Sequence, residues 1–293
     1  MILETYNLSK KYGPIIATEK ISLEIKEGTA FGLLGPNGSG KTTTLGMVMS
    51  VLNPDNGWFK WFGSKPDKAT YKRIGCLLEV PNFFPYLSLK KNLEIIARIR
   101  EVESGDIDRV LDETGLLNRK NTRFDTLSLG MKQRMAIGSA LLGNPEVLDL
   151  DEPANGLDPE GIAEVRSLIL KQRERGKTII MASHILDEVE KVCTHVAILK
   201  KGEVITSGEV DKLLQMDDMI IVSTDKPEIL KAELESGGLA KSVTISGNSL
   251  EIIPAGGTDS ATINRLAYEK GVVLTELRIR KSSLEEQFLQ LVK

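Results

Sequence analysis

Residues 35–43, with the sequence GPNGSGKTT, have the spacing of a loop that binds phosphate. Gly35 is followed by four residues and then by Gly40, Lys41 and Thr42, which is the phosphate-loop pattern. Glycines let backbone N–H groups converge on phosphate oxygens where a side chain would intrude. The lysine supplies a point charge to the β- and γ-phosphates, and the threonine hydroxyl can bind Mg²⁺. The residues expected to hold a nucleotide are Gly35, Pro36, Asn37, Gly38, Ser39, Gly40, Lys41, Thr42 and Thr43.

The segments on either side of this loop support the same interpretation. Residues 29–34, TAFGLL, predict a strand before the loop, and residues 42–50, TTTLGMVMS, predict a helix after it. The N-terminus of such a helix favours an anion. The alternative is a glycine-rich turn with a chance lysine, and the strand–loop–helix context favours the phosphate loop.

A second candidate site lies at residues 145–153, PEVLDLDEP, where a predicted strand ends in two adjacent acids. Side chains alternate along a strand, so Asp151 and Glu152 point in different directions and can do different work. Asp151 suits the shell of a magnesium ion through water. Glu152 suits a general base that activates the attacking water. The alternative is a pair of acids with no catalytic function, as Asp149 two positions earlier illustrates.

A third candidate site is residues 126–142, TLSLGMKQRMAIGSALL, which predict a capped helix. Ser128 stands at the expected N-cap, and Gly130 leaves the backbone open to an anion. From these residues alone, an ordinary capped helix is the simpler interpretation.

Composition indicates a globular chain with enough residues for two domains. The 293 residues are 41% hydrophobic and 27% charged, with a net charge of −3, which gives no general reason to expect nucleic acid or an anionic membrane as a partner. No apolar run approaches the ~20 residues of a membrane helix, and the N-terminus lacks the apolar stretch of a signal peptide.

Cys76 and Cys193, 117 positions apart (193 − 76), form no zinc or disulfide framework and suit a reducing cytoplasm. Both are expected to be small, unreactive core residues.

The order of predicted elements divides the chain near residue 215. Before it, short apolar runs alternate with helical patterns and predict an α/β domain with a largely parallel sheet covered on both faces. The predicted strands lie at 31–35, 73–79, 146–151, 177–183 and 195–200, and residues 80–145 are predicted to be helical. After it, residues 216–293 predict strand–helix–strand–strand–helix–strand, a small ferredoxin-like α+β domain. A final helix begins near Ser283, which can form a capping box with Glu286.

Together these motifs resemble the ATP-binding subunits of ABC transporters, over about residues 1–215. LSLGM at 127–131 is similar to the family's signature motif, with Leu129 and Met131 where a glycine and a glutamine are usual. The resemblance implies a phosphate-loop cassette with an added antiparallel β part and a helical subdomain at about 80–145. It also implies that NGLDP at 155–159 crosses a subunit interface with Asp158, and that His184 contacts the γ-phosphate and steadies the catalytic Glu152. Tyr12 matches the aromatic residue on which adenine stacks, although a surface tyrosine is the alternative.

Glu79 stands where this family usually has a glutamine, between the catalytic core and the helical subdomain. The resemblance implies that this position senses Mg²⁺ and the attacking water. A carboxylate can bind a hard cation, but an ionised one cannot donate a hydrogen bond as an amide does. The alternative is a solvated acid at a strand end. Glu79, LSLGMKQR and the C-terminal domain also resemble the bacitracin-export and lantibiotic-immunity branch of the family.

The resemblance implies an ATPase with ATP and Mg²⁺ as ligands and with two ATP molecules bound in a head-to-tail homodimer. Ser128, Gly130, Met131 and Asp158 of one subunit would meet the nucleotide held by the other. The partner would be an integral membrane permease that expels membrane-active peptides, which places the chain at the cytoplasmic face of the membrane, and no nucleic acid is expected. The alternative is an ABC ATPase that acts on ribosomes or DNA, with the C-terminal domain as a regulatory module.

Overall fold

The chain forms two compact units, Met1–Val210 and Asp211–Lys293. The computed structural model describes residues 1–78, 83–103, 105–214 and 219–280. Each unit has its own core of buried apolar side chains.

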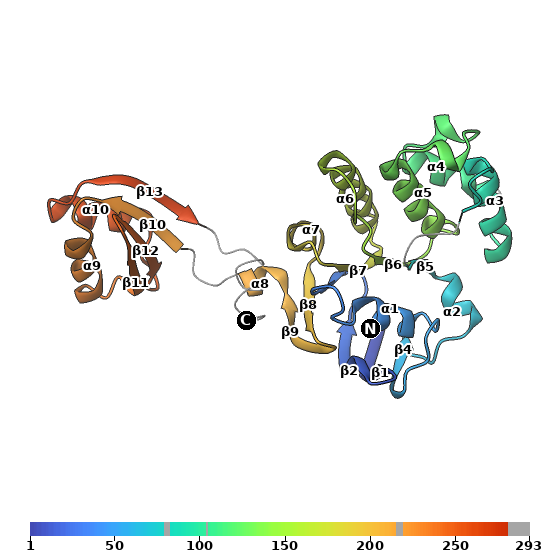
Figure 1. Ribbon diagram of the computed structural model, residues 1–293, viewed down its shortest axis with the longest axis horizontal. Helices are drawn as coiled ribbons and strands as arrows, with labels where there is room; N and C mark the ends of the chain where they lie inside the picture. Colours follow the sequence, from blue (N-terminus) through green and yellow to red (C-terminus); the bar gives the residue numbers. More distant parts are fainter. Residues whose placement is uncertain (79–82, 104, 215–218, 281–293) are drawn as a thin grey trace. The chain divides into compact units, whose positions relative to one another are not determined.

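A six-stranded sheet forms the centre of the first unit (Figure 1). Its first five strands are parallel, and the last is antiparallel. The predicted parallel strands are confirmed, but β9 was not among the predicted runs because its residues alternate between exposed and half-buried. In sheet order the strands are β5 (Ile74–Leu77), β6 (Val147–Asp151), β7 (Thr178–Ser183), β3 (Ala30–Leu34), β8 (His195–Lys200) and β9 (Glu203–Glu209).

Helices cover both faces of this sheet, as the continuous burial of its central strands requires. α1 (Lys41–Val48) packs on one face, where Met47 and Val48 join the main core. α7 (Leu186–Val192) packs on the opposite face. A Cβ at Gly32 would lie 2.6 Å from Val189 Cγ1, so this position of β3 needs a glycine for α7 to approach.

A three-stranded antiparallel sheet packs on the far side of α1. It is formed by β2 (Ile15–Ile25), β1 (Leu3–Tyr12) and β4 (Asn56–Trp61) in that order. Trp61 is fully buried in the shared core, and its indole Nε1 donates a hydrogen bond to the Val48 carbonyl over 2.8 Å. In β1 and β2 buried residues alternate with more exposed ones, and β4 is mostly exposed, so none of the three has the continuous apolar run that predicts a core strand.

The region from residue 83 to residue 145 is helical where the structure describes it, apart from an isolated bridge between Ser88 and Arg123. This confirms the helical prediction for that region. Ser88 caps α3, and Ser128 caps α5 by accepting a hydrogen bond from the Met131 amide over 3.3 Å. The elements are α3 (Leu89–Arg100), α4 (Asp106–Glu113), short 3-10 turns at Leu117–Arg119 and Phe124–Thr126, and α5 (Leu129–Leu141).

Glu113, at the end of α4, ties the helical region to α6 (Pro159–Glu174) and the residues that follow. Its carboxylate accepts from Gln172 over 3.0 Å and pairs with Arg109 and Arg175 at 2.8 Å each. Burial by itself would raise the pKa of Glu113, but the hydrogen bonds from Arg175 and Arg109 outweigh it and hold the pKa below its ordinary value. The ionised carboxylate therefore stabilises the fold.

We expect Glu113→Gln to lower the free energy of unfolding by about 1–3 kcal/mol at pH 7, because two arginines lose a charged partner. A lowered folded-state pKa contributes stability above the ordinary pKa of 4.5 and loses it as the pH falls through the folded value. The difference between the wild type and the variant should therefore shrink below about pH 4.5. Urea unfolding followed by tryptophan fluorescence measures this difference in stability, since Trp58 and Trp61 both lie in the first unit.

Asp187→Asn, in an exposed pair with Lys191, is the control and should cost under about 1 kcal/mol. A constant difference across this pH range would contradict the prediction.

Asp149 lies in β6, and its carboxyl group is buried in the protein core with no exposed surface. Neither of its oxygens has a hydrogen-bond partner. Burial, and then the nearby charge of Asp151, raises its pKa well above the ordinary value. Across the sheet it faces Cys76, its register partner on β5.

We expect Asp149→Val to raise the free energy of unfolding by about 1–3 kcal/mol, because it removes a buried polar group that has no partner. Valine also suits a buried strand. The measurement is denaturant unfolding at pH 7 with tryptophan fluorescence. Asp149→Asn is the matched control, since it keeps the shape and the buried polarity and should gain less. A valine variant less stable than the wild type would show that the carboxyl group has a stabilising contact.

Both cysteines are free, as predicted. Burial raises the pKa of the Cys193 thiol to about 12. Burial raises the pKa of Cys76 as well, with the charges of Asp149 and Asp151 adding to the effect. Thiolates are the reactive form, so these shifts agree with the expectation of unreactive thiols.

The second unit has the predicted βαββαβ order, and its antiparallel sheet runs β11-β12-β10-β13. One face packs against both helices around a core that includes Val222, Leu234 and Ile263. Residues 281–293, with the predicted capping box at Ser283 and Glu286, lie outside the described residues. The elements are β10 (Met219–Thr224), α9 (Pro227–Ser236), β11 (Ala240–Ser246), β12 (Ser249–Pro254), α10 (Ser260–Glu269) and β13 (Leu274–Arg280), after a short α8 (Val210–Leu214) that begins at the boundary between the units.

Among the helices of the described ranges, none is both long enough and apolar enough to cross a membrane.

Candidate functional site

The predicted phosphate loop joins β3 to α1, as the sequence pattern requires. Gly38 and Gly40 have positive φ angles of 78° and 103°, a region that L side chains rarely adopt. A Cβ at Gly40 would lie 2.6 Å from the Ala17 carbonyl oxygen, whereas a Cβ at Gly38 would meet nothing within 4 Å. The loop therefore packs against β2 on one side and stays open at Gly38, which is the cradle that a phosphate group needs.

Lys41, the first residue of α1, has its ammonium inside this loop and is only 5% exposed. Its Nζ donates hydrogen bonds to the carbonyl oxygens of Gly35 over 2.8 Å and Pro36 over 3.3 Å. It also lies 3.3 Å from the Glu152 Oε1. This places a buried positive charge where the loop would hold phosphate oxygens.

Glu152 follows directly after β6 and has a positive φ of 47°, which is uncommon for a residue other than glycine. Its amide donates to the Ala182 carbonyl over 2.9 Å, which holds the turn against β7. Its Oε2 lies 2.8 Å from the Nδ1 of His184, just beyond the end of β7. One carboxylate therefore contacts both Lys41 and His184. The family resemblance implied that His184 steadies Glu152, whereas the contact between Glu152 and Lys41 was not predicted.

Lys41 and Glu152 line one cavity of about 340 Å³, whereas His184 is not among its lining residues. It contains the phosphate loop, Glu152 and the half-exposed Tyr12 at the end of β1. Ile15, Ile16 and Ala17 of β2 also line it. The sequence prediction missed these three, although their position just after Tyr12 and Gly13 was a usable signal. The lining residues are Tyr12, Ile15, Ile16, Ala17, Asn37, Gly38, Ser39, Gly40, Lys41, Thr42, Thr43 and Glu152.

A second cavity, of about 460 Å³, lies where the helices α5 and α6 begin. Ser128 is the N-cap of α5, and Asp158 is the N-cap of α6, where it accepts a hydrogen bond from the Gly161 amide over 2.9 Å. A Cβ at Gly130 would lie 3.9 Å from the Gly161 Cα, so the first turns of the two helices pack closely. The lining residues are Ser128, Leu129, Gly130, Met131, Arg134, Gly156, Leu157, Asp158, Glu160, Gly161 and Glu164.

The two cavities have no residue in common within one chain. The residues predicted to meet a nucleotide therefore fall into two groups, one around the phosphate loop and one around Ser128 and Asp158. Glu79 lies outside the described residues.

The oxygen groups at the phosphate loop suit Mg²⁺ that arrives with a nucleotide. In the described part of the chain, no group of three or more His, Cys, Asp or Glu side chains could hold a metal alone. Magnesium is usually bound by one or two protein oxygens together with substrate phosphates. The Thr42 hydroxyl, in the first cavity, and the Asp151 carboxylate, at the end of β6, are such hard oxygen ligands. The buried Ser39 Oγ, which has no hydrogen-bond partner, adds a further polar atom to the loop.

A strand, a glycine-rich loop with a buried lysine and an adjacent carboxylate define a nucleotide-binding protein of the phosphate-loop class. Comparison with known proteins identifies the family to which this chain belongs. Residues 18–155 match the ABC transporter family. The bacitracin transport ATP-binding protein BcrA of Enterococcus faecalis is 32% identical over 99% of this chain and 96% of its own length. The protein of the same name from Bacillus licheniformis is 34% identical over 99% and 97%. The chain therefore belongs to the ABC transporter family, as an ATP-hydrolysing subunit.

Solved structures agree with this assignment. An ABC transporter subunit from Clostridium perfringens superposes with a TM-score of 0.66 and 30% identity, covering 73% of this chain and 91% of its own. A dimeric bacterial ABC transporter cassette superposes with a TM-score of 0.64 and 26% identity, covering 71% of this chain and 99% of its own. The resemblance drawn from the sequence motifs and the predicted fold class are confirmed.

Proposed function

We propose that this chain is the ATPase subunit of an exporter for membrane-active peptides, and that it closes with a second copy around two ATP molecules and drives a separate membrane permease. The observation that carries the proposal is the first cavity, which gathers Tyr12, the phosphate loop and the Lys41–Glu152 pair. Residues 1–215 form the ATP-binding domain in this proposal, and residues 216–293 form an accessory domain.

In the proposed reaction, the phosphate loop from Gly35 to Thr43 holds the triphosphate, and Tyr12 stacks on the adenine. Lys41 stabilises the negative charge that develops on the transferred phosphoryl group. Glu152 accepts a proton from the attacking water. His184 holds the Glu152 carboxylate in place, a role for which the 2.8 Å contact is the support.

Magnesium would be held by Thr42 and Asp151, with Glu79 as a further oxygen ligand. When bound, it supplies positive charge to the β- and γ-phosphate oxygens. The hard oxygen donors of Thr42 and Asp151 support this assignment.

The proposed dimer is head-to-tail, so that Ser128, Gly130, Met131 and Asp158 of one copy meet the γ-phosphate held by the other. Two observations support it. The second cavity is separate from the phosphate loop within one chain, and a solved relative is a dimeric cassette. Closure of the second copy would exclude water from the nucleotide and complete the site.

The substrate and the partner are inferred from two relatives that carry the name of bacitracin transport proteins and match nearly the whole chain, including the second unit. A third relative, the Nod factor export ATP-binding protein I of Burkholderia orbicola, is 32% identical over 83% of each chain. Both names describe transport across a membrane. In this proposal the transport path lies in the permease.

The test is a pull-down from detergent-solubilised source cells with tagged Glu152→Gln protein, ATP and Mg²⁺. We expect a polytopic membrane protein to co-purify, and deletion of its gene to sensitise cells to peptide antibiotics. The same pull-down without nucleotide is the control. Recovery of ribosomes or nucleic acid in place of a membrane protein would overturn the proposed partner.

A further inference from the structure

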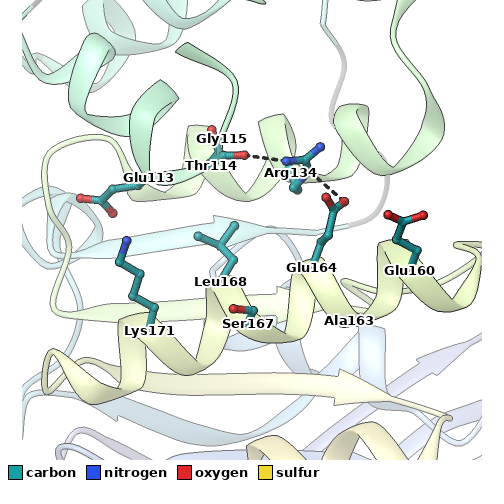
Figure 2. Close-up of a pocket in the computed structure, with 10 residues that line it drawn as sticks. All are labelled: Glu113, Thr114, Gly115, Arg134, Glu160, Ala163, Glu164, Ser167, Leu168 and Lys171. Atoms are coloured by element: carbon teal, nitrogen blue, oxygen red, sulfur yellow. Dashed lines mark hydrogen bonds and ion pairs between the residues drawn. The ribbon is translucent and has the colours of Figure 1, made fainter. Parts of the chain in front are cut away.

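Arg134 connects three helices beside the second cavity. Its guanidinium Nη1 donates to the carbonyl oxygen of Thr114, the C-cap of α4, over 3.1 Å. Its Nε lies 3.4 Å from the Glu164 Oε2 on α6, an ion pair in which this Nε makes no hydrogen bond. Arg134 itself belongs to α5 and is mostly buried, with 18% of its side chain exposed. Figure 2 shows the side chain of Arg134 between Thr114 and Glu164, with both contacts drawn.

Arg134 on α5 and Glu164 on α6 lie at equivalent positions relative to the N-terminal ends of their helices. Arg134 lies six positions after Ser128 (134 − 128), and Glu164 lies six positions after Asp158 (164 − 158). The Cα of each residue is therefore about 9 Å along its helix from the N-cap, at the helical rise of 1.5 Å per residue. An ion pair between equivalent positions holds the two N-caps level with each other.

The surroundings make this pair sensitive to removal. Arg134 and Glu164 line both the second cavity and a neighbouring hollow of about 490 Å³ between the helical region and α6. Beside this hollow, the ion pair links α5 to α6, and the hydrogen bond to Thr114 links α5 to α4. The local backbone is also adapted to the arginine, since a Cβ at Gly115 would lie 3.1 Å from its Nη1. The guanidinium fork can hold a carbonyl and a carboxylate at once, which a lysine cannot do in the same geometry.

We infer that Arg134 is a positioning residue: through Glu164 and Thr114 it aligns the α5 and α6 N-termini, so that Ser128, Gly130 and Asp158 reach the partner's nucleotide together. The inference rests on the proposed ATP-driven dimer. Arg134 lines the second cavity but not the first, so its loss should leave ATP binding by a single chain unchanged and weaken the closure of the dimer.

The experiment measures ATP-driven dimerisation by sedimentation in the Glu152→Gln background, with ATP affinity measured separately on each variant. We expect Arg134→Ala to raise the dimer dissociation constant about tenfold and Glu164→Ala to raise it about three- to tenfold. The double variant should be no weaker than Arg134→Ala by more than about twofold, because both changes remove one interaction. ATP affinity should stay within about twofold, and Arg134→Lys should recover part of the dimerisation.

Glu174→Ala is the matched control, since it removes an exposed carboxylate from the same helix, α6, away from Arg134. It should dimerise like the parent. Glu164 is 44% exposed, so its variants should fold even if Arg134→Ala does not. Unchanged dimerisation in the Arg134 and Glu164 variants, or effects that multiply in the double variant, would overturn the inference. A Glu152→Gln parent that stays monomeric with ATP would instead overturn the proposed dimer, and the inference with it.

Discussion

Glu152→Gln is expected to lower ATP turnover by roughly 10²- to 10⁴-fold, the usual contribution of a general base. The amide keeps the size of the carboxylate, so it can remain beside His184, but it cannot accept a proton from water at neutral pH. The structure also favours this loss of turnover, because Glu152 is the carboxylate that contacts both Lys41 and His184. Phosphate release under saturating ATP and Mg²⁺ is the measurement.

Nucleotide binding should survive in this variant, since the phosphate loop is intact. Removing the Glu152 charge also frees the Lys41 ammonium from a competing carboxylate 3.3 Å away, so ATP affinity should be equal to or higher than that of the wild type. Glu203→Gln, an exposed acid at the start of β9, is the control and should change turnover by less than about twofold. Turnover near the wild-type value in Glu152→Gln would remove Glu152 from the proposed role.

Gly40→Ala is expected to destabilise the first unit by about 2–4 kcal/mol and to abolish measurable nucleotide binding. The backbone at Gly40 has a φ of 103°, which costs an alanine about 1–3 kcal/mol. Its Cβ would also lie 2.6 Å from the Ala17 carbonyl oxygen, a backbone atom that cannot rotate away. The loop must then move off β2, and the amides that face the phosphate move with it.

Gly38→Ala separates the effect of the positive φ angle from the effect of the Cβ contact with Ala17. Gly38 also has a positive φ, of 78°, but a Cβ there would meet nothing within 4 Å. We therefore expect a loss of only about 1 kcal/mol in the free energy of unfolding without nucleotide. Urea unfolding followed by tryptophan fluorescence compares the two variants, and titration with a fluorescent ATP analogue measures binding. Equal destabilisation by both substitutions would show that the contact with Ala17 does not hold the loop.

The nucleotide cavity also explains why the N-terminal strands belong to the same unit as the central sheet. Tyr12 ends β1 and Ala17 lies in β2, so the three-stranded sheet supplies one wall of the cavity and the contact that shapes Gly40. α1 lies between the two sheets, and its first residue, Lys41, lines the cavity beside the phosphate loop. Burial of α1 from both sides thereby holds the lysine in the phosphate loop.

Sequence by itself determined the features whose residues are contiguous in the chain. The phosphate loop, with the strand before it and the helix after it, follows from local glycine and apolar patterns. The same holds for the N-cap at Ser128 and for the continuous apolar runs that became β3, β5, β6, β7 and β8. The βαββαβ order of the second unit was also readable, because each of its elements has a distinct period. The half-exposed strands β1, β2, β4 and β9 were not, because their apolar faces alternate with polar ones.

Only the tertiary structure decided which of these segments meet. Lys41, Glu152 and His184 are 111 and 32 positions apart (152 − 41 and 184 − 152). They meet because β3 and β6 are both hydrogen-bonded to β7 in parallel, which brings the carboxyl ends of the three strands to one edge of the sheet. Periodicity reports which face of a strand is buried, but not which strand lies beside it. The Arg134–Glu164 pair depends likewise on how α5 packs against α6, which is set by side-chain volumes at the contact and not by either helix alone.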